Sequence, residues 1–115
     1  MYARGMKGKA DRLFSQLIRS RGACERCGST QNLQTAHIVS RRYSATRCDP
    51  MNAFCSCARC HLELTGDPYA HVLWANLYLG EDGYTAMRQK ALDGRRPDWA
   101  AVVDELTIKL REASH

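Results

Sequence analysis

The chain has 115 residues, the length of one ordinary domain, so separate catalytic and regulatory domains are not expected. Hydrophobic residues make up 44% and charged residues 25%, a balance that excludes disordered and fibrous proteins. The net charge is +5, made up of +8 in residues 1–60 (11 basic, 3 acidic) and −3 in residues 61–115 (6 basic, 9 acidic). A basic half beside an acidic half predicts a polyanion-binding face with a scaffold behind it.

No apolar run approaches the roughly 18 residues that a membrane span requires. The basic N-terminal segment, residues 1–9, is not followed by the long apolar region of a secretory signal. We therefore expect a cytoplasmic protein with no membrane partner. In that reducing compartment, six cysteines favour metal binding over disulfides.

The pattern of apolar residues, glycines and prolines predicts two short strands among five helices. In chain order we expect a helix at 10–21, strands at 33–39 and 52–55 joined by a basic loop, and helices at 58–66, 68–80, 84–92 and 98–113. In the first helix, Phe14 and Ile18 fall on one apolar stripe with their leucine neighbours. Asp67 and Pro68 occupy the cap and first position of a later helix. This order predicts an α+β fold.

Two C-x2-C pairs, Cys24/Cys27 and Cys57/Cys60, carry the strongest signal in the chain. Two residues between thiolates let both sulfurs point inward, so each pair supplies half of a tetrahedral site. The stretch between the pairs holds both predicted strands, and a bound ion would close that loop. The sequence therefore predicts a structural Zn²⁺ held by these four cysteines.

Two cysteines and one rival motif remain. Cys48 and Cys55 are expected to be small apolar core residues, although Cys55 lies close enough to Cys57 to replace it in the site. The run from Cys57 to His61 also matches the C-x-x-C-H signature of haem attachment. That chemistry goes with exported proteins and leaves the Cys24 pair unexplained, so zinc is the preferred interpretation.

Between the cysteine pairs, His37 lies on the first expected strand and Asn52 begins the second, while His61 directly follows Cys60. In its frame of paired cysteines, this pattern resembles the zinc-supported HNH endonucleases, and most closely the phage recombination nucleases of the NinG/Rap type. The flanking residues that share the resemblance are Leu13-Phe14, Ile18-Arg19, Ser40-Arg41-Arg42-Tyr43, Thr46-Arg47, Asp49-Pro50-Met51 and Leu64-Thr65-Gly66. It covers residues 11–66, about half of the chain.

The resemblance implies a ββα-metal core over residues 10–66 within a single domain. One helix would precede the core and about three would follow, as a helical extension over residues 67–115. The implied activity is metal-dependent hydrolysis of DNA phosphodiester bonds, by nicking or cutting double-stranded or branched DNA. The implied setting is phage or prophage recombination in the cytoplasm of a bacterial or phage-infected cell. The oligomeric state is left open.

Three residues carry the implied chemistry. His37, a side chain that titrates near neutral pH, suits the general base that removes a proton from water. His61 would ligate a catalytic divalent ion, Mg²⁺, Mn²⁺ or another, distinct from the structural zinc. Asn52 has no useful proton chemistry, and the resemblance implies that its amide orients the loop bearing His37 or approaches the metal.

One position departs from the family pattern. In many HNH enzymes the residue before the general base ligates the catalytic metal, whereas here it is Ala36. Mg²⁺ needs few protein ligands when water and phosphate complete its octahedron, and Asp49 and Glu63 are candidate replacements. The alternative is a zinc-stabilised DNA-binding protein without catalysis. A third possibility is a zinc module that binds protein partners through its acidic half.

Arg41, Arg42 and Arg47 lie between the two predicted strands, where their guanidinium groups are expected to contact DNA phosphates. Tyr43 stands among them and either stacks on a base or is a partly buried tyrosine of the hairpin. His71 and the terminal His115 are expected to be non-catalytic.

Overall fold

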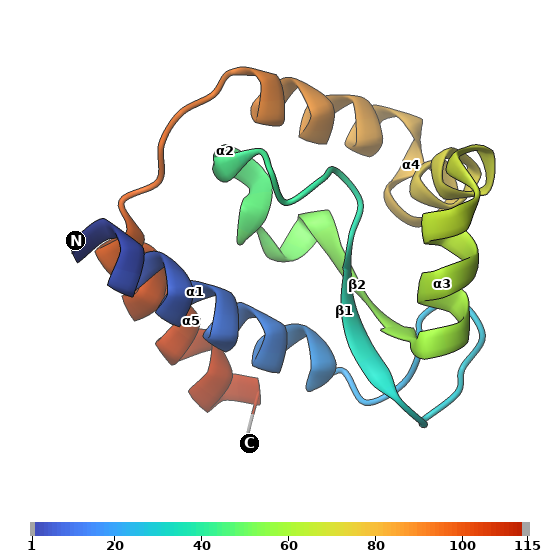
Figure 1. Cartoon of the computed structure of the whole chain (residues 1–115), viewed down its shortest axis with the longest axis horizontal. Helices are drawn as coiled ribbons and strands as arrows, with labels where there is room; N and C mark the ends of the chain where they lie inside the picture. The colour runs from blue at the N-terminus through green and yellow to red at the C-terminus, as the bar shows by residue number, and fades with distance from the viewer. Residues whose placement is uncertain (1, 114–115) are drawn as a thin grey trace.

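The computed structural model describes the backbone of residues 2–113 and the side chains of residues 5–113. One two-stranded antiparallel sheet lies between helices on both of its faces (Figure 1). In chain order the elements are α1 (Tyr2–Arg19), β1 (Leu33–His37), α2 (Ser44–Arg47), the 3₁₀ helix η1 (Pro50–Asn52), β2 (Ala53–Cys57), α3 (Ala58–Gly66), α4 (Pro68–Leu92) and α5 (Trp99–Ala113). The predicted α+β class is confirmed. The expected basic loop contains α2 and η1, and α1 begins well before residue 10.

The register of the sheet places His37 opposite Ala53 and Leu33 opposite Cys57. Because side chains alternate along a strand, Ala53 and Cys55 face one layer of helices while Phe54 faces the other. Both β strands therefore contribute to two hydrophobic cores. Each strand also leaves one edge unpaired, since the described sheet has two strands only.

The first core joins the two ends of the chain. Phe14 and Ile18 of α1 are at most 2% exposed, and they pack with Val103 and Leu106 of α5 and with Cys55 of β2. Figure 1 shows α5 running alongside α1. Burial of each large apolar side chain contributes about 1.5–3 kcal/mol, so this pairing is a main source of stability.

The second core lies on the opposite face of the sheet and centres on Phe54. The Trp74 ring meets the Phe54 ring edge-on with centroids 5.4 Å apart, and it stacks on Tyr78 at 5.5 Å. Leu64 of α3 and Ala36 of β1 complete this core. It fastens α3 and the first part of α4 to the sheet.

Helix α4 starts as predicted and bends at a glycine. Asp67 Oδ1 accepts hydrogen bonds from the backbone N–H groups of Tyr69 and Ala70, with Pro68 in the first turn. Gly80 has φ 77° and ψ 159°, a conformation open essentially to glycine alone, and the second part of α4 turns back over α2 (Figure 1). Although α4 has 25 residues, neither it nor any other helix within residues 2–113 is apolar enough to cross a bilayer.

Candidate metal centre and active site

The four predicted cysteines form one compact cluster. The sulfurs of Cys24, Cys27, Cys57 and Cys60 all lie within 4.8 Å of one another. The Cys27 and Cys57 sulfurs are 3.7 Å apart, close to the separation of about 3.8 Å that a tetrahedral site with Zn–S bonds of about 2.3 Å requires. Within residues 2–113 this is the one group of three or more potential metal ligands. The cluster can therefore hold a metal ion, and its donor set suits Zn²⁺.

Local hydrogen bonds prepare part of this cluster for ionisation. Burial raises the pKa of Cys24, but surrounding backbone N–H groups outweigh it and lower that pKa to about 6. The N–H of Cys60 donates to Cys57 Sγ at 3.4 Å and lowers the pKa of Cys57. Burial raises the pKa of Cys60 to about 12, so this thiol keeps its proton until a cation replaces it.

Two arginines lie beside the cluster. The Arg26 guanidinium donates to Glu63 at 2.6 Å. This hydrogen bond is the main cause of the raised pKa of Arg26, and a smaller contribution comes from Cys60. Cys27 is the main cause of the raised pKa of Arg59. A divalent ion bound by four thiolates carries two net negative charges, and these guanidinium groups offset them.

The remaining cysteines are outside the cluster. Cys55 is fully buried in the first core, and Cys48 packs partly buried against it. Neither joins the metal ligands, in agreement with the core role predicted for both. Cys57 and Cys60 face the Cys24 pair, an arrangement that favours zinc over haem attachment.

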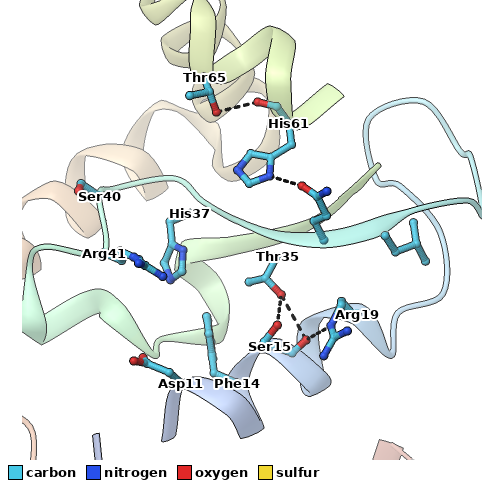
Figure 2. A pocket seen from close by; sticks show the side chains of 12 residues that line it. Asp11, Phe14, Ser15, Arg19, Thr35, His37, Ser40, Arg41, His61 and Thr65 are labelled. Atoms are coloured by element: carbon cyan, nitrogen blue, oxygen red, sulfur yellow. Dashed lines mark hydrogen bonds between the residues drawn. The ribbon is translucent and has the colours of Figure 1, made fainter. Parts of the chain in front are cut away.

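A cleft of about 760 Å³ runs along the unpaired edge of β1, with α1 on one side and α3 on the other (Figure 2). Its lining includes both histidines singled out by the sequence, together with side chains that no motif marked. The lining residues are Asp11, Phe14, Ser15, Arg19, Leu33, Gln34, Thr35, His37, Ser40, Arg41, His61 and Thr65. The cleft thus joins His37 at the end of β1 to His61 on the first turn of α3.

His37 is held in one tautomer. Its Nε2 lies 2.9 Å from the carbonyl oxygen of Arg47, and because a carbonyl only accepts, Nε2 carries the proton and Nδ1 keeps its lone pair. The ring rests on Phe14, with centroids 5.6 Å apart. Burial lowers the pKa of His37, and the guanidinium groups of Arg41 and Arg47 lower it further. The imidazole is therefore neutral at pH 7, with Nδ1 as an available base.

His61 is oriented by a neighbour on β1. Its Nδ1 lies 2.7 Å from Gln34 Oε1, an oxygen that only accepts, so Nδ1 donates, and the lone pair of the neutral ring is on Nε2. Figure 2 shows His61 at the opposite side of the β1 ribbon from Thr35 and Ser15. Neighbours that fix a histidine tautomer in this way are typical of metal-binding imidazoles.

Asn52 ties the loop after His37 to the start of β2. The residue is fully buried, and its Oδ1 accepts from the Val39 N–H at 2.8 Å. Its Nδ2 donates to the carbonyls of Val39 and Thr46 at 3.0 and 3.1 Å. Asn52 does not line the cleft. Its geometry is that of a residue that orients the loop, one of the two roles implied by the resemblance.

The three arginines proposed for phosphate contact have different surroundings. Arg47 Nε and Nη2 each donate to an Asp11 carboxylate oxygen at 2.8 Å, and Nη1 donates to the Arg41 carbonyl at 2.9 Å. The guanidinium of Arg47 is therefore engaged inside the protein, between α1 and α2. Arg41 lines the cleft, whereas Arg42 lies over the Tyr43 ring at 5.2 Å.

The candidate replacement ligands and the remaining histidines are placed elsewhere. Asp49 accepts from the Met51 N–H and pairs with Lys90, and Glu63 binds Arg26 and Arg59; neither lines the cleft. Ala36 is 3% exposed inside the second core. His71 Nε2 donates to the Ile38 carbonyl at 2.7 Å, a structural contact, and His115 lies outside the described residues.

Sequence reasoning missed two residues that shape the cleft. Asp11 holds Arg47, whose carbonyl in turn accepts from His37, and Gln34 orients His61. Asp11 lies 36 residues from its partner and belongs to no motif. The one available signal for Gln34 was its place on the same short strand as His37.

Compared with models of protein families, with curated proteins and with solved structures, the chain gives no match. The comparisons therefore assign no family, and the resemblance to HNH endonucleases stays a prediction from the sequence.

Proposed function

We propose that this protein is a metal-dependent endonuclease of the HNH type that hydrolyses DNA phosphodiester bonds, nicking or cutting double-stranded or branched DNA. One observation carries the proposal. Two imidazole nitrogens that carry the lone pair of a neutral ring, His37 Nδ1 and His61 Nε2, belong to one cleft whose charged groups are mainly cationic. A base, a metal ligand and cations are the groups that phosphodiester hydrolysis requires.

His37 acts as the general base. Its Nδ1 accepts a proton from the attacking water, and the imidazolium that forms is stabilised through the Nε2–H bond to the Arg47 carbonyl. The lowered pKa of His37 keeps the base unprotonated at neutral pH. Asp11 is a positioning residue, because its bidentate contact holds the segment that carries this carbonyl.

His61 Nε2 would hold the catalytic divalent ion. When bound, such an ion supplies an electrophile for the scissile phosphate and offsets charge on the leaving oxygen. The fit rests on the orientation of the His61 ring, because the bond from Nδ1 to Gln34 leaves Nε2 as the nitrogen that can ligate a cation. With Ala36 buried in the core, water and phosphate oxygens would supply most of the other ligands, as is common for Mg²⁺.

Arg41 and Arg19 give the cleft its affinity for a phosphate backbone. Both line it, and its one carboxylate, Asp11, is paired with Arg47. Unpaired guanidinium groups attract phosphates and form short charge-assisted hydrogen bonds with them. DNA binding is therefore proposed to weaken steeply as the salt concentration rises, and Arg41→Ala is proposed to flatten that dependence.

The cysteine cluster would bind a structural zinc that supports the site. Cys60 immediately precedes His61, and Cys57 caps α3 by accepting from the Cys60 N–H. A zinc ion there would fix the first turn of α3, and with it the position of the His61 ring. This zinc ion would thus support catalysis by positioning His61 and would take no part in the chemical step.

A DNA-binding protein without catalysis is the second candidate. The observation that favours it is the absence, within residues 2–113, of any second group of three potential metal ligands. Such a protein would retain the zinc, the basic cleft and the salt-dependent affinity for DNA. It would differ from the first candidate only in chemistry.

The discriminating experiment is the relaxation of supercoiled plasmid with Mg²⁺ or Mn²⁺. His37→Ala is expected to lower the nicking rate by about 10²–10⁴ while zinc content and DNA affinity stay near normal. The matched control is His71→Gln, since the glutamine amide can still donate to the Ile38 carbonyl outside the cleft. Nicking by folded His37→Ala at the wild-type rate contradicts the assignment. No cleavage by wild type with Mg²⁺, Mn²⁺, Co²⁺ or Ni²⁺ would favour the non-catalytic candidate.

A further inference from the structure

A second cavity, of about 250 Å³, lies between the loop after β1 and the second part of α4. Val39, Ser40 and Tyr43 line it from the loop, and Tyr84, Arg88 and Leu92 line it from α4. Ser40 also lines the His37 cleft, and Figure 2 shows it with Arg41 at the His37 end of that cleft. The two cavities therefore adjoin at one residue.

Two tyrosines from different elements define the character of this cavity. Tyr43 has the Arg42 guanidinium 5.2 Å from its ring centroid, and Tyr84 has that of Arg88 at 5.6 Å. Among the ring contacts of residues 2–113, none joins Tyr43 to Tyr84. The two ring surfaces thus border the cavity without covering each other.

The polar side chains that line the cavity are hydroxyl groups and one guanidinium group, all of which can donate hydrogen bonds. No carboxylate of the described chain lines it. Neither tyrosine hydroxyl has a hydrogen-bond partner among residues 5–113, and the Arg88 guanidinium forms no ion pair there. A ligand that suits this lining is flat and aromatic, has polar edges, and is joined to an anion.

We propose that this cavity binds one unpaired nucleobase of the DNA whose backbone occupies the His37 cleft, and the inference rests on the proposed function. Aromatic rings bind unstacked bases through their π-faces, and nearby guanidinium groups add cation–π attraction. The cavity is much smaller than the cleft, so it accommodates one ring system and not a strand.

The bend at Gly80 is what creates this arrangement. It turns the second part of α4 over α2 (Figure 1), and Tyr84 of that part then lines the same cavity as Tyr43. A base must leave its stack before it enters the cavity, which costs least where the nucleotide is already unpaired. DNA with an unpaired nucleotide beside the bound phosphate is therefore the preferred ligand.

The test compares two labelled duplexes that differ in a single bulged nucleotide, one with a thymine base and one abasic. Their affinities for the zinc-loaded protein are measured by fluorescence anisotropy without added divalent ion, so that no cleavage intervenes. Wild type is expected to bind the thymine bulge about 10- to 100-fold more tightly than the abasic bulge.

Variants assign this preference to the cavity. Tyr43→Leu and Tyr84→Leu are each expected to lose most of it while affinity for the abasic duplex stays unchanged, whereas Tyr84→Phe keeps it. The matched control is Tyr69→Leu, because Tyr69 is on α4 but 74% exposed and outside the cavity. Should a leucine variant misfold, Leu92→Trp fills the cavity from its exposed side and is expected to remove the preference.

The outcomes separate the two proposals. Equal affinity of wild type for both bulges overturns the base cavity and leaves the proposed nuclease intact. A preference that survives in Tyr43→Leu, Tyr84→Leu and Leu92→Trp also overturns it. Failure to bind any DNA overturns both, while failure to cleave, with the preference present, removes only the catalytic step.

Discussion

Replacing Asn52 with alanine should destabilise the protein more than any other single change in the loop after β1. The side chain is fully buried, and its three hydrogen bonds of 2.8, 3.0 and 3.1 Å satisfy backbone groups of Val39 and Thr46. Asn52→Ala leaves the Val39 N–H and carbonyl without a partner, at a cost of about 1–3 kcal/mol each, and removes one of the hydrogen bonds to the Thr46 carbonyl, which still accepts from the Asp49 N–H. Because losses above about 5 kcal/mol are exceptional, we expect a total of about 3–5 kcal/mol.

Urea denaturation of the zinc-loaded protein measures this loss. The matched control is Asn76→Ala, since Asn76 donates one hydrogen bond to the Val72 carbonyl within an exposed helical turn, and it should change stability by less than about 0.5 kcal/mol. The free energy of unfolding of a small domain is roughly 5–15 kcal/mol in total, so the Asn52→Ala variant should be only marginally folded. A loss below about 1 kcal/mol would refute the reasoning and show that other contacts hold the loop.

Three further predictions concern the metal and the two histidines. A chelator should unfold the protein with the release of one zinc ion per chain, because a four-cysteine site contributes folding free energy directly. Circular dichroism measures the unfolding and elemental analysis measures the zinc. A protein that stays folded without metal contradicts this prediction. The lowered pKa of His37 means that the base stays neutral as the pH falls to about 6.5. The cleavage rate should therefore be constant down to that pH and decline only below it. A pH–rate profile in which the rate falls to half its maximum above pH 7 argues against His37 as the base. Gln34→Ala should weaken Mn²⁺ binding at His61 about 10- to 100-fold in a titration followed by electron paramagnetic resonance, with Gln34→Glu retaining affinity, and unchanged binding in Gln34→Ala would count against the orienting role.

Features that depend on neighbours in the chain were predictable from the sequence. The spacing of Cys57 and Cys60 determines that both sulfurs meet at the start of α3, and the structure places them with the other pair. Asp67 and Pro68 begin α4 as expected, because capping and a fixed proline φ act within one turn. The apolar stripe of α1 likewise predicted the burial of Phe14 and Ile18, while its leucines are half-buried beside them.

Contacts between residues that are far apart in the sequence were revealed only by the tertiary structure. From sequence, Arg47 was one of three equivalent phosphate ligands, whereas the fold brings Asp11 to it and engages its guanidinium. The unpaired edge of β1 lets one cleft reach both His37 and His61, and no local pattern encodes which edge stays free. Local propensity acts over a few residues, whereas burial selects partners anywhere in the chain. The cysteine site was therefore predictable from spacing, while the shape and charge of the cleft were decided by the packing of α1, β1 and α3.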